Sequence, residues 1–90
     1  MVSDTVIIRN PEGLTLKPAA DFCMEAAKYQ SVVTFTVHGH TANAKSVLSV
    51  LAACVVCGDE VTIECSGADE DEALKNICAV AEREREEQDG

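Results

Sequence analysis

Basic residues are scarce in this sequence. Seven Lys and Arg stand against 16 Asp and Glu, which gives a formal net charge of −9 at pH 7. Phosphate backbones and anionic lipid headgroups repel such a protein, so we expect neither nucleic-acid binding nor attachment to a membrane. Much of the acidity lies at residues 69–71 and in a tail at about 82–90. Both segments are typical of a solvated helix face and a frayed chain end.

Long apolar runs, linkers and internal repeats are also missing. No segment has the length of a signal peptide or a membrane-spanning helix. A chain of 90 residues leaves little room for a second core, so we expect one domain over residues 1–90. The cysteines are odd in number: Cys23, Cys54, Cys57, Cys65 and Cys78. These features favour reduced thiols in a cytoplasmic protein, where a buried cysteine serves as a small hydrophobe.

Alternation of apolar and polar residues predicts four short strands. The first runs from Val2 to Ile8 and ends at a turn, Asn10-Pro11-Glu12-Gly13. The clearest alternation lies at Val33, Phe35 and Val37, and another at Val61, Ile63 and Cys65. Between them, His38-Gly39-His40 is typical of a hairpin turn that leads into a short strand at Thr41 and Ala42. We expect both histidines to be solvated turn residues.

Apolar residues at helical spacing predict three helices. Their apolar faces are Ala19, Phe22, Cys23 and Ala26; then Val47, Val50, Leu51 and Cys54; and finally Ala73, Leu74, Ile77, Cys78 and Ala81. Thr15 and Ser46 precede the first two helices as candidate N-caps. The resulting order β-α-β-β-α-β-α predicts an α+β open-faced sandwich, with a mainly antiparallel four-stranded sheet covered on one face by three helices.

Two segments of the chain resemble the HPr family, the histidine-containing phosphocarriers of the bacterial sugar phosphotransferase system. Residues 10–20, Asn-Pro-Glu-Gly-Leu-Thr-Leu-Lys-Pro-Ala-Ala, resemble the active-site segment of that family. Residues 43–46, Asn-Ala-Lys-Ser, precede a short apolar helix and resemble its regulatory serine segment. The order of elements also matches over essentially the whole chain. The resemblance implies an HPr-like fold and a cytoplasmic protein that is not an enzyme and needs no cofactor or metal.

The residue that accepts phosphate in the family is absent. The family has histidine at the position of Thr15 and arginine at the position of Lys17. Neutral imidazole is a far better leaving group than an alkoxide, so a threonine phosphate would be a poor phosphoryl donor. Lys17 keeps the positive charge but lacks the planar fork of arginine. We therefore expect Thr15 to be a helix cap and surface residue and not a phosphoryl carrier.

Ser46 is the better candidate for a functional residue. The resemblance implies that HPr kinase/phosphorylase phosphorylates Ser46 and that the product binds a transcriptional regulator or another phosphotransferase-system protein. Crh-like members of the family have glutamine in place of the histidine and keep this serine. A phosphate at the start of a helix is favoured by the helix dipole, and Lys45 would help to hold it.

The family also docks its partners through an apolar surface made by the first two helices. The positions that match this surface are Leu16, Lys17, Ala20, Val47, Leu48 and Leu51. Leu48 lies outside the apolar stripe of its helix, so the helical pattern itself predicts that it is exposed.

Cys54 and Cys57 form an isolated CxxC sequence. A zinc site would need a second ligand pair, and neither His38 nor His40 has a suitable spacing. A thioredoxin-like motif begins a helix, whereas this sequence ends one. We therefore predict that the two cysteines are structural and pack in the interior.

Three functions stay open. The first is a regulatory or adaptor module in carbon catabolite control that acts through phosphorylation of Ser46. The second is a phosphocarrier that uses an acceptor other than Thr15. The third is an adaptor without phosphorylation, such as a partner of a sugar-processing complex. Thr15 argues against the second function, and the sequence does not separate the first from the third.

Overall fold

The computed structural model describes residues 1–83. Its elements in chain order are β1 (Val2–Ile7), α1 (Leu16–Ala27), β2 (Val32–Val37), β3 (His40–Asn43), α2 (Val47–Ala52), β4 (Glu60–Ser66) and α3 (Glu70–Ala81). This order is the predicted one. Most of the predicted acidic tail, residues 84–90, lies outside the described residues.

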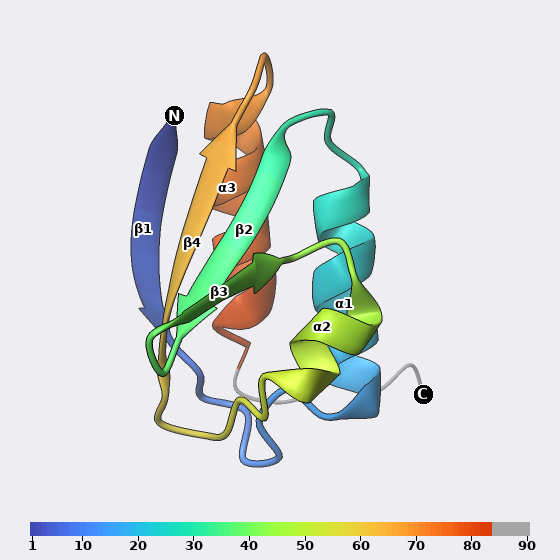
Figure 1. The fold of residues 1–90 in the computed structure, drawn as a ribbon, viewed down its shortest axis with the longest axis vertical. Helices are drawn as coiled ribbons and strands as arrows, with labels where there is room; N and C mark the ends of the chain where they lie inside the picture. Colours follow the sequence, from blue (N-terminus) through green and yellow to red (C-terminus); the bar gives the residue numbers. More distant parts are fainter. Residues whose placement is uncertain (84–90) are drawn as a thin grey trace.

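The strands form one antiparallel sheet in the order β1-β4-β2-β3. All three helices lie on the same face of this sheet, and the other face is open (Figure 1). The predicted open-faced sandwich is therefore confirmed. One row of side chains crosses the open face through all four strands: Thr5, Thr62, Thr36 and Thr41. Hydroxyl pairs join the outer strands to their neighbours, at 2.9 Å for Thr5–Thr62 and 2.7 Å for Thr36–Thr41.

The core lies between the sheet and the helices and is built from the predicted alternating and helical positions. Phe22 of α1 and Phe35 of β2 meet edge to face, with ring centroids 6.0 Å apart and planes at 89°. Ile63 of β4 and Ile77 of α3 are also completely buried. Burying these large apolar side chains is the main favourable contribution to folding in a chain of this size. Within residues 1–83, every helix is too short or too polar to span a lipid bilayer.

The second helix is shorter than predicted. α2 ends at Ala52, and Cys54 has a left-handed backbone with φ of +53°. A left-handed residue cannot continue an α-helix, so Cys54 leaves the apolar stripe and is exposed. Val50 is the one fully buried residue of α2, whereas Val47 is 37% exposed. The predicted four-residue apolar face is therefore wrong at both ends.

The prediction that residues 69–71 form a solvated acidic face is wrong for Asp69. Its side chain connects the start of α3 to the residues just before β2. Its carboxylate accepts hydrogen bonds from the backbone N–H of Gln30 at 2.9 Å and of Ser31 at 3.0 Å. It also accepts one from the hydroxyl of Ser31, which is completely buried. These hydrogen bonds, first that of the Ser31 hydroxyl, lower the pKa of Asp69.

Candidate functional site around the starts of α1 and α2

Two loops meet at one end of the molecule, the β1–α1 loop (residues 8–15) and the α2–β4 loop (residues 53–59) (Figure 1). Ile8 donates its N–H to the carbonyl of Asp59 at 2.9 Å and accepts one from Gly58 at 2.7 Å. Further along, Leu14 donates its N–H to the carbonyl of Val55 at 3.0 Å. These main-chain bonds fix the course of the β1–α1 loop against its neighbour.

Gly13 lets the two loops approach closely. Its φ is +69°, a conformation that glycine adopts without steric cost. A Cβ at this position would lie 2.3 Å from the carbonyl oxygen of Val55 and 2.8 Å from the Cα of Val56. The turn before it is closed by the N–H of Gly13, which bonds to the carbonyl of Asn10 at 2.8 Å. The predicted turn at residues 10–13 therefore supports a tight main-chain contact.

Thr15 is the N-cap residue of α1, but its side chain makes no cap hydrogen bond. The predicted position is confirmed, whereas the predicted capping by the hydroxyl is wrong. Its carbonyl accepts the N–H of Ala19 at 2.8 Å, so the helix begins through the main chain alone. The Thr15 side chain is exposed. Two residues further along the chain, Lys17 forms a long ion pair of 3.4 Å with Asp21.

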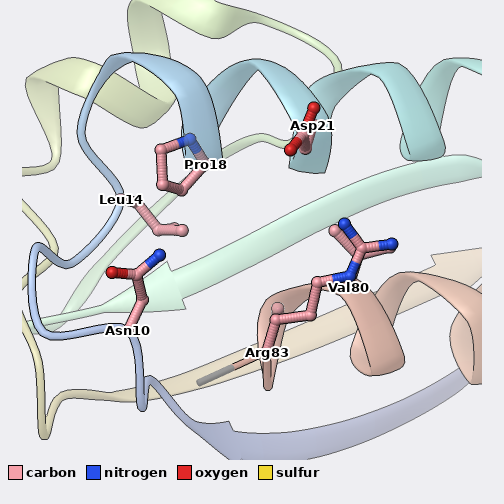
Figure 2. A pocket seen from close by; sticks show the side chains of 7 residues that line it. Asn10, Leu14, Pro18, Asp21, Val80 and Arg83 are labelled. Atoms are coloured by element: carbon pink, nitrogen blue, oxygen red, sulfur yellow. The ribbon is translucent and has the colours of Figure 1, made fainter. Parts of the chain in front are cut away.

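A small recess lies beneath this loop (Figure 2). Asn10, Leu14 and Pro18 face Val80 near the end of α3 and Arg83 just beyond that end. The cavity volume of about 10 Å³ is at the lower limit for a single water molecule. This recess therefore has no room for a small-molecule substrate, and the exposed surface beside it is the better candidate for function.

Ser46 caps α2 as predicted. Its hydroxyl oxygen accepts the N–H of Ser49 at 3.2 Å. Lys45 does not lie free beside it, because its ammonium group donates to the carbonyl of Tyr29 at 2.8 Å. The expectation that Lys45 is available to hold a phosphate on Ser46 is therefore not met in this structure.

The predicted partner-binding residues lie on two helices that pack against each other, α1 and α2. Leu16 and Leu48 are 73% and 76% exposed. Val47 and Lys17 are also exposed, whereas Ala20 and Leu51 are half-buried. We refer to the six residues Leu16, Lys17, Ala20, Val47, Leu48 and Leu51 as the α1–α2 surface.

Two further exposed apolar residues were not predicted from the sequence. Met24 of α1 is 67% exposed and Val56 of the α2–β4 loop is 56% exposed. Leu16, Ala20 and Met24 are spaced by four residues, so helical periodicity places Met24 on the same side of α1. Nothing in the sequence pattern marks Val56, because its exposure depends on where α2 ends.

The CxxC sequence is not packed in the interior. Cys54 and Cys57 are both exposed free thiols, whereas Cys23, Cys65 and Cys78 are buried. The prediction of a buried structural pair is therefore wrong, and the cause is the early end of α2. Among residues 1–83, no three His, Cys, Asp or Glu side chains are grouped so that they could hold a metal ion.

Both histidines of the β2–β3 hairpin are exposed, as predicted. His38 lies in the turn with φ of +54°, and its Nε2 lies 3.0 Å from a carboxylate oxygen of Asp59. It therefore links the hairpin to the α2–β4 loop. His40 is exposed, as expected, but is the first residue of β3 and not a turn residue.

Comparisons with known proteins identify the family. Residues 2–83 match the family described as "PTS HPr component phosphorylation site". The HPr-like protein Crh of Bacillus subtilis (strain 168) is 38% identical over 84 residues, which cover 93% of this chain and 99% of the relative. The phosphocarrier protein HPr of Mycoplasma capricolum is 34% identical over 77 residues, 86% of either chain.

The fold comparison agrees. The crystal structure of HPr-C-His from Thermoanaerobacter tengcongensis has a TM-score of 0.87 and 32% identity, covering 90% of this chain and 91% of that one. HPr-family proteins in general are not enzymes and interact with other proteins of the phosphotransferase system. The match over almost the whole chain shows that this protein belongs to the HPr family, as an HPr-like protein of the phosphotransferase system and catabolite control.

Proposed function

We propose that this chain is a cytoplasmic regulatory or adaptor module of carbon catabolite control, switched by phosphorylation of Ser46, and that it carries no phosphoryl group at position 15. The observation that carries the proposal is the contrast between the starts of two adjacent helices. Thr15 at the start of α1 has only a hydroxyl, whose phosphate ester would be a poor phosphoryl donor. Ser46 at the start of α2 lies in the segment that resembles the family's regulatory serine segment, where a stable ester is what a switch needs.

The chemistry of Thr15 disfavours a phosphoryl relay. A phosphorylated imidazole transfers its phosphoryl group readily because neutral imidazole leaves easily, whereas a threonine ester lacks such a leaving group. Lys17 provides a point charge in place of a bidentate guanidinium. The family's phosphocarrier function therefore has no obvious acceptor at this loop.

Ser46 has the surroundings expected of a modifiable residue. Its hydroxyl oxygen is an acceptor for the N–H of Ser49 at 3.2 Å, and an ester oxygen could still take part in that bond. The exposed side chains of Val47 and Leu48 follow it directly. A phosphate of charge about −1.5 to −2 at Ser46 would thus change the electrostatic character of the α1–α2 surface.

We propose that HPr kinase/phosphorylase is one partner of this surface and that a transcriptional regulator or another phosphotransferase-system protein is the next. The exposed apolar residues Leu16 and Leu48 would supply contact area. A regulator with a basic pocket would read the phosphate, and its affinity would fall as salt concentration rises. We also propose that the single domain spans residues 1–90 and that it acts without enzymatic activity, cofactor or metal.

Intact-mass analysis after incubation with HPr kinase/phosphorylase and ATP tests the proposal. We expect one phosphate on the wild type and none on Ser46→Ala. Ser49→Ala is the matched control, because it removes a neighbouring hydroxyl of the same helix and should still accept one phosphate. If a histidine-containing HPr is modified in the same assay and this chain is not, the protein is an adaptor without phosphorylation.

A second assay tests the alternative that this chain is a phosphocarrier, because some of its relatives are phosphocarrier proteins. Enzyme I and phosphoenolpyruvate should give no acid-labile phosphoryl adduct on the wild type. The Thr15→His, Lys17→Arg double variant should gain one if the α1–α2 surface still binds enzyme I. A stoichiometric adduct on the wild type would overturn the proposal.

A further inference from the structure

The five thiols of the chain divide into two groups by exposure. Cys23, Cys65 and Cys78 are buried, whereas Cys54 and Cys57 are exposed. Burial raises the pKa of all three interior thiols, that of Cys78 to about 11. Because the thiolate is the reactive form, these three are protected both by access and by protonation. Thiol reagents in solution therefore meet the Cys54–Cys57 pair first.

The pair brackets the segment that holds the β1–α1 loop. The two residues between the cysteines are Val55, whose carbonyl accepts the N–H of Leu14 at 3.0 Å, and Val56, whose Cα faces Gly13. The sulfur of Cys57 itself lies 3.7 Å from the carbonyl oxygen of Arg9, which belongs to the same loop. A chemical change at the two thiols therefore acts directly on the loop that leads to Thr15.

The bracketed segment can shift without unfolding a regular element. Val55 and Val56 lie between α2 and β4 and belong to neither. The chain turns on both sides of them, at Cys54 with φ of +53° and at Gly58 with φ of +95°. The N–H of Val56 is bound by the Asp59 side chain at 2.8 Å, an exposed contact. An adjustment here costs local hydrogen bonds and disturbs the packing of Val55, which is buried, but it leaves the hydrogen bonds between the strands intact.

We propose that Cys54 and Cys57 form a reversible dithiol–disulfide site, oxidised by low-molecular-weight disulfides, and that the oxidised form loosens the contact between Leu14 and Val55. One cysteine thiolate attacks the small disulfide, which forms a mixed disulfide and releases one small thiolate. The second cysteine thiolate then attacks the protein sulfur of that mixed disulfide, forms the Cys54–Cys57 bond and releases the second small thiolate. The protons of both cysteines go to solvent or to the released thiolates, and the small disulfide takes up the two electrons.

The effect on the loop follows from disulfide geometry. The bond requires the two Cα atoms to lie within about 7 Å of each other and fixes the dihedral angle between the sulfurs. In the proposed oxidised form this constraint acts on residues 55 and 56, and therefore directly beside the Leu14–Val55 hydrogen bond. If the thiol pair regulates the α1–α2 surface, that regulation rests on the proposed function of the surface. The formation of the disulfide itself does not depend on any partner.

The full chain treated with oxidised glutathione tests the site. Intact-mass analysis without reductant should show the loss of two hydrogens and no retained glutathione, and peptide mapping should join Cys54 to Cys57. Cys54→Ser and Cys57→Ser should each stop at one glutathione adduct, and the double variant should not react. Retention of glutathione by the wild type, or no reaction at all, would overturn the proposal.

Hydrogen exchange gives a readout of the loop. Oxidation should increase exchange of the Leu14 amide about fivefold, as expected for loss of one typical hydrogen bond. The amide of Ser31, bound to Asp69 at the other end of the sheet, is an internal control and should not change. Unchanged exchange at Leu14 in fully oxidised protein would refute the coupling. Neither readout needs the kinase, so failure of Ser46 phosphorylation and failure of this site are distinguishable.

Discussion

Replacing Gly13 by alanine should destabilise the protein much more than the same replacement at Gly39. The two glycines are matched in backbone conformation, with φ of +69° and +77°. A left-handed backbone costs a residue with a Cβ about 1–2 kcal/mol, so both variants pay that penalty. The two positions differ in the room available for an added Cβ. An added Cβ meets nothing within 4 Å at Gly39, whereas at Gly13 it lies 2.3 Å from the carbonyl oxygen of Val55.

The overlap at Gly13 cannot be relieved by rotating a side chain, because its nearest neighbours are backbone atoms of Val55 and Val56. The two loops must move apart, which lengthens the 3.0 Å bond between Leu14 N–H and the Val55 carbonyl. Loss of that bond costs about 1 kcal/mol, and overpacking typically costs about 1–3 kcal/mol more. We therefore expect losses of about 1–2 kcal/mol for Gly39→Ala and about 3–6 kcal/mol for Gly13→Ala.

Urea unfolding followed by far-ultraviolet circular dichroism measures both losses, since the chain has no tryptophan for fluorescence. Hydrogen exchange at the Leu14 amide should also accelerate in Gly13→Ala and not in Gly39→Ala. Equal losses of unfolding free energy in the two variants would refute the loop contact as the source of the difference.

Other predictions concern the caps, the Asp69 contact and the surface. Ser46→Ala should lower the free energy of unfolding by about 1 kcal/mol because it removes a cap hydrogen bond. Thr15→Ala removes no such bond and should change the free energy of unfolding by less than about 0.5 kcal/mol. Similar urea midpoints for the two variants would contradict this prediction. Hydrogen bonds, first from the Ser31 hydroxyl, lower the folded-state pKa of Asp69. Its stabilising contribution is therefore complete above the unfolded value of about 3.9 and is lost as pH falls through the lower folded value. Urea unfolding at a series of pH values should show that the difference in unfolding free energy between the wild type and Asp69→Asn shrinks in that range. A difference that does not change with pH would refute this role of Asp69. Leu48→Ala should weaken partner binding, measured by calorimetry, while unfolding free energy changes by less than about 0.5 kcal/mol.

The sequence predicted the elements whose side chains repeat with a regular period and are long enough to show it. The faces at Phe22 and at Ile77 sit on 12-residue helices, and the alternation around Phe35 and Ile63 sits on central strands. α2 has six residues, less than two turns, so an apolar residue beyond its end still fits the helical spacing. Cys54 fits that spacing and yet lies outside the helix, which is why the exposed thiol pair was not predicted.

Hydrogen bonds between distant segments were beyond the reach of sequence patterns. Asp69 lies in an acidic run that is typical of a solvated face, and its contacts with Gln30 and Ser31 arise because the fold brings the start of α3 beside the loop between α1 and β2. The same is true of His38 and Asp59, which are joined by the fold and separated by 20 residues of sequence. In contrast, the cap at Ser46 is local and was predicted from residue type and position, although the same reasoning was wrong for the hydroxyl of Thr15.

The proposed function requires that position 15 carry no phosphoryl group, and the structure of the β1–α1 loop shows which contacts are independent of that side chain. The loop is held by the close approach of Gly13 to Val55 and by the Leu14–Val55 hydrogen bond. α1 begins through the carbonyl of Thr15, which any residue supplies. None of these interactions uses the side chain of residue 15. A change at that residue is therefore expected to alter the chemistry available at the start of α1 and to leave the geometry of the α1–α2 surface in place.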